Sequence, residues 1–360
     1  MSGLGTQRCY PLRQIDPRTG GTATTYACFF SGQYPQFGGQ DGVSAFPASP
    51  CSARGFFLTL CAGGVVAYRE AMTFNPDARI NDSKVNRHRG RTAGFAVGGG
   101  GAGIIVLLIV GQLLGVDLSG FAGGSDDTSS DENLSQCTTG QDANESIDCR
   151  MAGAALSIDS YWASLPNATG YGSPDFQLFS DSVSTGCGAS SSAVGPFYCP
   201  TDETIYLDTG FFDALKSRFD ASGGPLAQMY VVAHEWGHHI QNISGTMANL
   251  DQRDTGPGSD SVRLELQSDC YSGAWAGSAS TVPDESGTPF LQPITQPQIA
   301  DALNAAAAIG DDRIQQQTGG QVDPESWTHG SSEQRQRWFT AGFEGGPGAC
   351  DTFGVPAASL

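Results

Sequence analysis

Positive charge is scarce in this sequence. Its 360 residues include 18 Lys and Arg against 37 Asp and Glu, which gives a formal net charge of −19. The imbalance lies in residues 117–360, which hold eight basic and thirty-two acidic side chains, whereas residues 1–93 hold ten and five. Because an acidic surface repels phosphate, nucleic acid is excluded as a partner of the larger part. The acidic composition instead indicates a well-hydrated surface.

Histidine is also rare, with five in the chain, and three of these lie within one short stretch. His234 and His238 are four positions apart, so on a helix both imidazoles project from one face and can bind one Zn²⁺ ion. Glu235 then stands where a general base is needed. Pro225 as a helix start and Gly245 as a stop predict a helix around this motif. A chance occurrence on an ordinary amphipathic helix is the alternative, and the scarcity of histidine disfavours it.

A catalytic zinc takes three protein ligands and leaves one position for water. Glu265 and Asp269 are one turn apart on a second predicted helix, so their carboxylates share a face. We assign Glu265 as the third ligand and Asp269 as the acceptor for the outer nitrogen of a ligating histidine. Two acids on a solvated helix face are the alternative. We predict that His329 donates a hydrogen bond to the oxyanion that forms when zinc-activated water attacks a peptide carbonyl. A surface histidine near a helix start is the alternative.

No two cysteines have the C-x-x-C spacing that is typical of structural zinc sites. Six of the ten cysteines lie beyond residue 116, and an even number suits disulfides in an oxidising compartment. Several connectivities are possible for six cysteines. Local spacing favours two pairs and leaves the third: Cys137 with Cys149, Cys187 with Cys199, and Cys270 with Cys350.

Residues 94–116 carry no charge and are long enough to cross a bilayer as one helix. A buried glycine-rich helix and a cleaved signal segment are alternatives. Basic residues precede this segment and acidic residues follow it. The positive-inside rule therefore predicts a single-pass protein of the cell membrane, with a cytoplasmic N-terminus and an extracytoplasmic catalytic domain.

Composition and periodicity divide the rest of the chain. The predicted parts are a disordered or untranslated extension (1–71, with Met72 as the true start), a basic cytoplasmic segment (72–93), a flexible acidic stalk (117–148), a zinc metallopeptidase domain (149–353) and a tail (354–360). The domain is predicted to be α+β, mainly helical with a small β-sheet. Its predicted helices span 151–165, 211–219, 226–243, 262–277, 298–309 and 331–343, and its strands span 176–179 and 204–208.

The strand predicted at 204–208 precedes the zinc helix region in the chain. In peptidases with this zinc motif such a strand commonly forms the sheet edge along which an extended substrate lies. An ordinary core strand is an equally good interpretation.

In these motifs the chain resembles the neutral zinc metallopeptidase family of bacterial membrane-associated proteins. The likeness covers about Met72 to Phe353, and residues 1–71 depart from it. It is carried by residues 85–90, 196–200, 206–208, 233–239 and 265–271, and by 329–332 ahead of Arg335 and Trp338. The resemblance implies a peptidase with His234, His238 and Glu265 as zinc ligands and Glu235 as the catalytic acid, without naming a substrate.

The leading hypothesis is a membrane-anchored zinc endopeptidase that acts on a peptide or protein substrate. Either a peptide bond in a protein or a cell-wall cross-link fits the sequence, and the oligomeric state is open. The alternative is a non-catalytic, zinc-stabilised binding or scaffolding module of the cell envelope. Structural zinc is closed by a fourth protein ligand, which Cys270 or His239 would have to supply.

Overall fold

The structure, a computed structural model, describes residues 73–80, 85–89, 130–166, 168–219, 221–251 and 253–360, together with four N-terminal strands. The chain divides into two units, Met1–Ala71 and Met72–Leu360. In the first unit, β1 (Gln7–Ile15) pairs antiparallel with β2 (Thr22–Phe30), and β3 (Leu58–Cys61) pairs with β4 (Gly64–Ala67). The prediction for residues 1–71 did not include these strands, although threonine and aromatic side chains in β2 favour extended backbone.

The second unit contains a five-stranded mixed sheet of order β10-β11-β7-β5-β6. The central strand β7 runs parallel to both β5 and β11, while β6 and β10 are antiparallel edge strands. A separate hairpin, β8 (Ser182–Thr185) and β9 (Gly188–Ser191), follows β7. The strands of the sheet are β5 (Val85–Arg89), β6 (Ser130–Asn133), β7 (Asp175–Leu178), β10 (Phe197–Cys199) and β11 (Thr204–Leu207).

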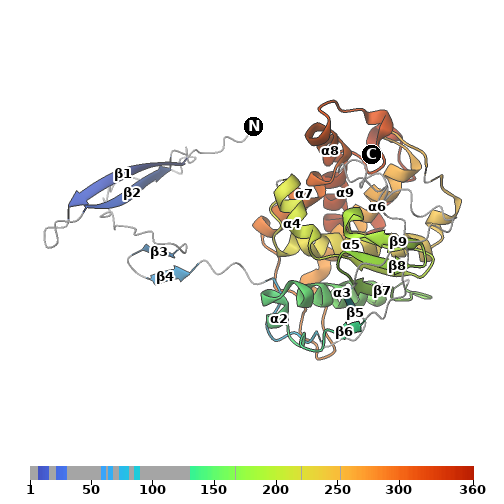
Figure 1. Ribbon diagram of the computed structural model, residues 1–360, viewed down its shortest axis with the longest axis horizontal. Helices are drawn as coiled ribbons and strands as arrows, with labels where there is room; N and C mark the ends of the chain where they lie inside the picture. Colours follow the sequence, from blue (N-terminus) through green and yellow to red (C-terminus); the bar gives the residue numbers. More distant parts are fainter. Residues whose placement is uncertain are drawn as a thin grey trace, which may run out of the picture. The chain divides into compact units, whose positions relative to one another are not determined.

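Helices form the larger part of this unit, so the predicted α+β, mainly helical fold is confirmed. Figure 1 shows α5 near the middle of this unit, with α6 packed against it and α9 packed against α6. The helices are α2 (Gly140–Glu145), α3 (Ile147–Ser164), α4 (Phe211–Phe219), α5 (Pro225–Ile243), α6 (Asp260–Ser278), α7 (Gln296–Ala308), α8 (Asp311–Thr318) and α9 (Ser332–Gly345).

Local sequence signals set the ends of the helices that carry the site. Pro225 is the first residue of α5, and Gly245 beyond its end adopts a left-handed conformation with φ +76°. The Ser259 side chain caps α6 by accepting from the backbone N–H of Val262 at 3.2 Å. A capping box starts α9, as predicted.

Small residues allow the three central helices to approach closely. A Cβ atom at Gly237 on α5 would lie 2.3 Å from the Oγ of Ser268 on α6. One at Gly342 on α9 would lie 1.8 Å from the carbonyl oxygen of Cys270 on α6. Both distances are far below van der Waals contact, so glycine is required at both crossings. The two contacts bring side chains of α5, α6 and α9 together in one place.

The folded unit includes residues that were predicted to lie outside it. Phe74 and Ile80 are fully buried, and Val85 begins a strand inside the sheet. The described part of the predicted stalk forms β6 and α2, and the Cys137–Cys149 disulfide ties it to α3. The boundary predicted near residue 149 is therefore wrong. The polar composition of the segment before residue 149 suggested a stalk, but a capping box and buried alanine and cysteine side chains order this segment.

The C-terminal tail predicted at 354–360 also packs on the domain. The Arg263 Nη1 donates to the Val355 carbonyl oxygen at 2.9 Å, and Leu360 is 2 % exposed beside Val262. Residues 94–116, the predicted membrane span, lie outside the described residues. Among the helices that the structure does describe, none combines the length and the apolar character that a bilayer crossing needs.

Candidate metal centre

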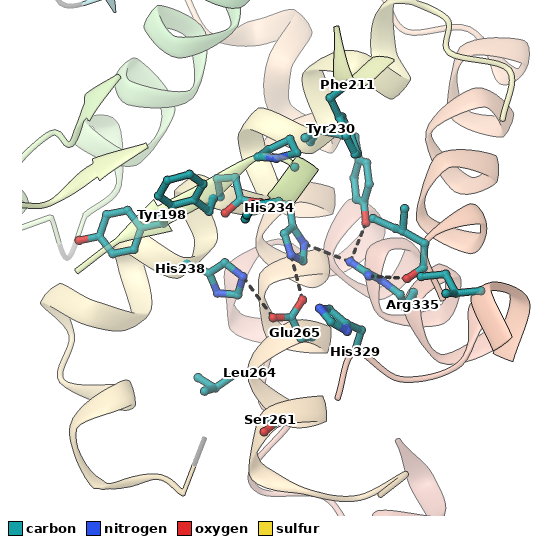
Figure 2. Close-up of a pocket in the computed structure, with 18 of the residues that line it drawn as sticks. Tyr198, Phe211, Tyr230, His234, His238, Ser261, Leu264, Glu265, His329 and Arg335 are labelled. Atoms are coloured by element: carbon teal, nitrogen blue, oxygen red, sulfur yellow. Dashed lines mark hydrogen bonds and ion pairs between the residues drawn. The ribbon is translucent and has the colours of Figure 1, made fainter. Parts of the chain in front are cut away.

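The three predicted ligands converge at the contact between α5 and α6. The His234 Nε2 lies 3.1 Å from the Glu265 Oε2, and the His238 Nε2 lies 3.4 Å from the Glu265 Oε1. One ligand atom from each residue lies within 4.8 Å of the others. The four-residue spacing on α5 brings the two imidazoles to one face, and the short distance between α5 and α6 brings the carboxylate to them (Figure 2).

The outer nitrogen of each histidine is held by a side-chain oxygen. The His234 Nδ1 lies 2.9 Å from the Asp269 Oδ1, as predicted, and the His238 Nδ1 lies 2.9 Å from the Gln241 Oε1. Gln241 in turn donates to the carbonyl oxygen of Leu264 at 2.7 Å, so its orientation is fixed from α6. Acceptors of this kind select the tautomer that presents Nε2 to a metal. The sequence reasoning missed Gln241, although it lies one helical turn beyond His238.

Asp269 is the centre of a buried network. Its carboxylate is fully buried and accepts from the Tyr230 hydroxyl and from the Arg335 Nε at 2.8 Å and Nη2 at 3.0 Å. Burial opposes ionisation, but Arg335 and His234 hold the pKa of Asp269 below its usual value. The sequence reasoning gave no role to Arg335. Tyr230 was also missed, although it lies four residues before His234 on the same face of α5.

These groups fit a divalent cation by donor chemistry. Two imidazole nitrogens and one carboxylate oxygen with one position open are the donors of a catalytic zinc site. Burial disfavours protonation of His234, yet Asp269 and Glu265 together raise its pKa to about 10. The two carboxylates that favour a proton on His234 would equally favour a divalent cation at this point, and binding of the cation would release that proton. Within the described residues, this is the group of His, Cys, Asp and Glu side chains that is close enough to hold one.

The two residues proposed as a fourth protein ligand are bonded to other partners. Cys270 forms a disulfide with Cys350. His239 is fully buried, with its Nδ1 3.1 Å from the Tyr198 hydroxyl and its Nε2 2.6 Å from the Gly172 carbonyl oxygen. Both candidates are therefore unable to close the site.

The three disulfides in residues 130–360 have the predicted pairing. The bonded pairs are Cys137 with Cys149, Cys187 with Cys199, and Cys270 with Cys350. The first joins β6 and α2 to α3, the second joins the β8–β9 hairpin to β10, and the third fixes the C-terminal segment to α6. The third bond lies one residue from Asp269, so it restrains the part of α6 that supports the metal centre.

Glu235 lines the same cavity as the three ligands and is 8 % exposed. Burial raises the pKa of Glu235, and the neighbouring His238 and His234 act in the opposite direction without cancelling this effect. A raised pKa makes a carboxylate a stronger base, which suits a group that accepts a proton and later returns it.

His329 also lines this cavity, and Asp311 fixes the loop that carries it. The Asp311 Oδ2 accepts from the backbone N–H groups of Thr328, His329 and Gly330 at 2.8, 2.6 and 3.0 Å. The His329 Nδ1 lies 3.3 Å from the Asp311 Oδ1. Burial opposes the protonated form of His329, but Glu265 and Asp311 raise its pKa. Asp311 was not anticipated from the sequence, because it is the first residue of α8 and contacts His329 from a distant position in the chain.

The sheet edge beside the cavity is β10. The sequence left two interpretations of 204–208, a substrate-binding edge or an ordinary core strand. The structure supports the second, because β11 pairs with β10 on one side and β7 on the other. Phe197 and Tyr198 of β10 line the cavity. The Tyr198 hydroxyl accepts from the Asn242 Nδ2 at 2.9 Å and lies 3.1 Å from the His239 Nδ1, which fixes β10 against α5. The order of strands depends on pairing between distant segments, which local pattern does not reveal.

Comparisons with known proteins agree with this arrangement. Residues 70–353 match the family described as "Putative neutral zinc metallopeptidase". An uncharacterized protein of Mycobacterium tuberculosis is 52% identical over 249 residues, which cover 67% of this chain and 84% of that relative. The uncharacterized protein YpfJ of Escherichia coli is 38% identical over 272 residues, which cover 72% of this chain and 90% of YpfJ. No solved structure matches the chain. The chain belongs to the neutral zinc metallopeptidase family.

Proposed function

We propose that this protein is a zinc-dependent endopeptidase that hydrolyses peptide bonds in peptides or proteins. The observation that carries the proposal is the convergence of His234, His238 and Glu265 beside Glu235 in a single cavity. The scaffolding alternative needs a fourth protein ligand, and the commitment of Cys270 and His239 to other partners speaks against it.

His234, His238 and Glu265 would hold one zinc ion. When bound, zinc would polarise the substrate carbonyl and lower the pKa of a water molecule toward ~7. Glu235 accepts the proton of the attacking water and returns it to the amine that leaves. The burial of Glu235 supports this role, because a raised pKa makes the carboxylate a better base and its acid form available for the second transfer.

His329 is proposed as the donor to the oxyanion that forms from the substrate carbonyl. Its position on the cavity wall and the hold of Asp311 on its Nδ1 support the proposal. A donor that is fixed before the reaction stabilises developing negative charge without reorganising.

An extended substrate is proposed to align along β10. An edge strand has free main-chain groups that can pair with a peptide, and β10 borders the cavity that contains Glu235. The contacts of the Tyr198 hydroxyl with α5 would keep this edge at a constant distance from the zinc ligands.

Attachment to the outer face of the cell membrane through residues 94–116 is also proposed. The fold limits how this segment can be placed in a membrane. Strand β5 precedes the segment, strand β6 follows it, and the two strands pair with each other. One bilayer crossing needs about 20 apolar residues, so 23 residues supply one crossing and not two. A single crossing would separate β5 from β6. The pairing of β5 with β6 therefore conflicts with the predicted cytoplasmic position of residues 72–93. We propose instead that β5 lies on the same side of the membrane as the zinc domain.

A labelling experiment tests this placement in intact cells. Asn86→Cys on β5 and Asp213→Cys on α4, both at exposed positions, are treated with a membrane-impermeant maleimide. We expect both to react from outside. Reaction of Asp213→Cys alone would restore the single-pass orientation and show that β5 does not pair in the cell.

The peptidase proposal is tested with the full chain, Glu235→Gln and the matched control Glu344→Gln, whose side chain is exposed on α9. Bound zinc is measured by mass spectrometry, and cleavage of casein is followed. We expect zinc in all three proteins and cleavage by the wild type and Glu344→Gln only. Zinc in all three with cleavage by none would favour the scaffolding module.

A further inference from the structure

The cavity extends beyond the zinc ligands toward α4 and α8. Its walls on this side are apolar side chains from α4, α5, α8 and the turn before α8: Phe211, Phe219, Val231, Ile309 and Ile314. We call these five residues the apolar subsite. Figure 2 shows Phe211 and Leu264 on opposite sides of the His234 and Glu265 pair. The ligands therefore lie between two parts of one cavity, and the apolar subsite is one of those parts.

Fixed charge is confined to the reaction centre. Of the described side chains that line the cavity, the carboxylates and guanidinium are Glu235, Glu265 and Arg335. Glu265 contacts both histidines, and Arg335 is paired with Asp269. The apolar subsite thus offers no partner to a charged substrate side chain, which would have to lose its hydration without compensation. An apolar side chain gains by the same transfer.

The size of the cavity limits what can enter. Its volume is about 160 Å³. A cavity of about 150 Å³ lined by leucine, isoleucine and phenylalanine is known to bind benzene. The apolar subsite is one part of this cavity, so it has room for no more than one aromatic ring or one branched side chain.

We propose that the apolar subsite selects substrates with one large apolar side chain, such as Phe, Leu or Met, next to the bond that is cut. The proposal depends on the peptidase function and adds the class of substrate. It disfavours the peptide cross-links of bacterial cell walls, because these present alanine and charged diamino acids at the bond. The occupant is an uncharged segment of an extended polypeptide.

A peptide library tests the proposal with the zinc-loaded full chain, and the cut sites are read by mass spectrometry. We expect Phe, Leu and Met to exceed Asp, Lys and Ala at one position beside the cut by at least about tenfold, the range that apolar pockets achieve. Cuts without this preference, or release of cell-wall cross-links as fast as cleavage of the apolar peptides, would overturn this inference and leave the proposed peptidase function standing. No cut in any peptide would overturn the proposed peptidase function instead.

A substitution in the wall links the preference to this part of the cavity. Ile309→Phe narrows the apolar subsite, and the matched control Ile243→Phe makes the same change at an exposed position near the end of α5. The measurement is the ratio of kcat/KM for a Phe peptide to kcat/KM for the matching Ala peptide. This ratio does not depend on the fraction of folded enzyme.

We expect Ile309→Phe to lower this ratio at least about fivefold, because the larger wall excludes the substrate ring, whereas Ile243→Phe leaves it unchanged. An equal ratio in the wild type and both variants would place the preference elsewhere and overturn the assignment to these five residues. Thermal unfolding of each variant confirms that a folded enzyme is compared.

Discussion

The Arg335 Nε donates to the Asp269 Oδ2 at 2.8 Å, and the two side chains are 1 % and 0 % exposed. The other oxygen of the same carboxylate lies 2.9 Å from the Nδ1 of His234. One ion pair therefore connects α9, α6 and the metal-binding face of α5. Both side chains are almost entirely shielded from solvent, so the charge of each is compensated mainly by the other.

Arg335→Gln leaves the Asp269 carboxylate buried without its cation. We expect the free energy of unfolding to fall by about 3–5 kcal/mol, as for other buried pairs that lose one partner. Zinc affinity should fall about 10- to 100-fold, because the support of His234 is weakened. Urea unfolding and competition with a chromophoric chelator measure the two effects. Arg337→Gln, at an exposed position on the same helix, is the control and should change neither.

Gln241→Met removes the acceptor of the His238 Nδ1 and keeps an unbranched side chain of similar size. We expect zinc affinity to fall about tenfold, because the imidazole loses the contact that fixes its orientation. The chelator competition is repeated with Gln317→Met, which changes an exposed position on α8. Equal affinity in Gln241→Met and the wild type would show that helix geometry alone orients His238.

Asp311→Asn should destabilise the protein in a manner that depends on pH. The folded pKa of Asp311 is lowered below the usual value of 3.8, as a net result in which His329 and the backbone N–H groups outweigh burial. The ionised carboxylate thus adds stability that is fully present above about pH 4 and is lost as pH falls through the folded pKa. We expect a loss of about 1–3 kcal/mol at pH 7.

The difference between wild type and Asp311→Asn should shrink as the pH is lowered from 7 to 3, in urea unfolding at each pH. A difference that stays constant over this range would contradict a role for the ionised form. In that case the ionised Asp311 carboxylate would not hold the His329 side chain, and the backbone alone would position it.

Gly342→Ala introduces a Cβ atom 1.8 Å from the carbonyl oxygen of Cys270, so α6 and α9 must separate. We expect a loss of stability of about 1–3 kcal/mol or more, together with lower zinc affinity, because α6 carries Glu265. Gly348→Ala has open space around the new atom and serves as the matched control. Equal unfolding midpoints for the two variants would show that the helices can move apart without cost.

Much of the candidate metal centre could be predicted because the positions of its residues depend on local sequence. The spacing of His234 and His238, and that of Glu265 and Asp269, places each pair on one helical face regardless of the rest of the fold. The helix boundaries followed from Pro225, from the capping residues and from periodicity. The three disulfides also matched the prediction, two of them through local spacing.

The remaining features depend on contacts between distant segments. Arg335 reaches Asp269 only because glycines let α9 approach α6, and sequence spacing carries no record of that approach. The position of β11 inside the sheet depends on its pairing with both β10 and β7. Polar composition around residues 130–148 suggested a stalk, whereas a few buried side chains and a disulfide order it.

Anomalous diffraction at the zinc edge from crystals of the zinc-loaded full chain tests the central claim most directly. We predict one zinc ion about 2.0–2.2 Å from the Nε2 atoms of His234 and His238 and from a carboxylate oxygen of Glu265, with no protein atom in the fourth position. A zinc ion closed by a fourth protein side chain, or bound away from Glu265, would contradict the account.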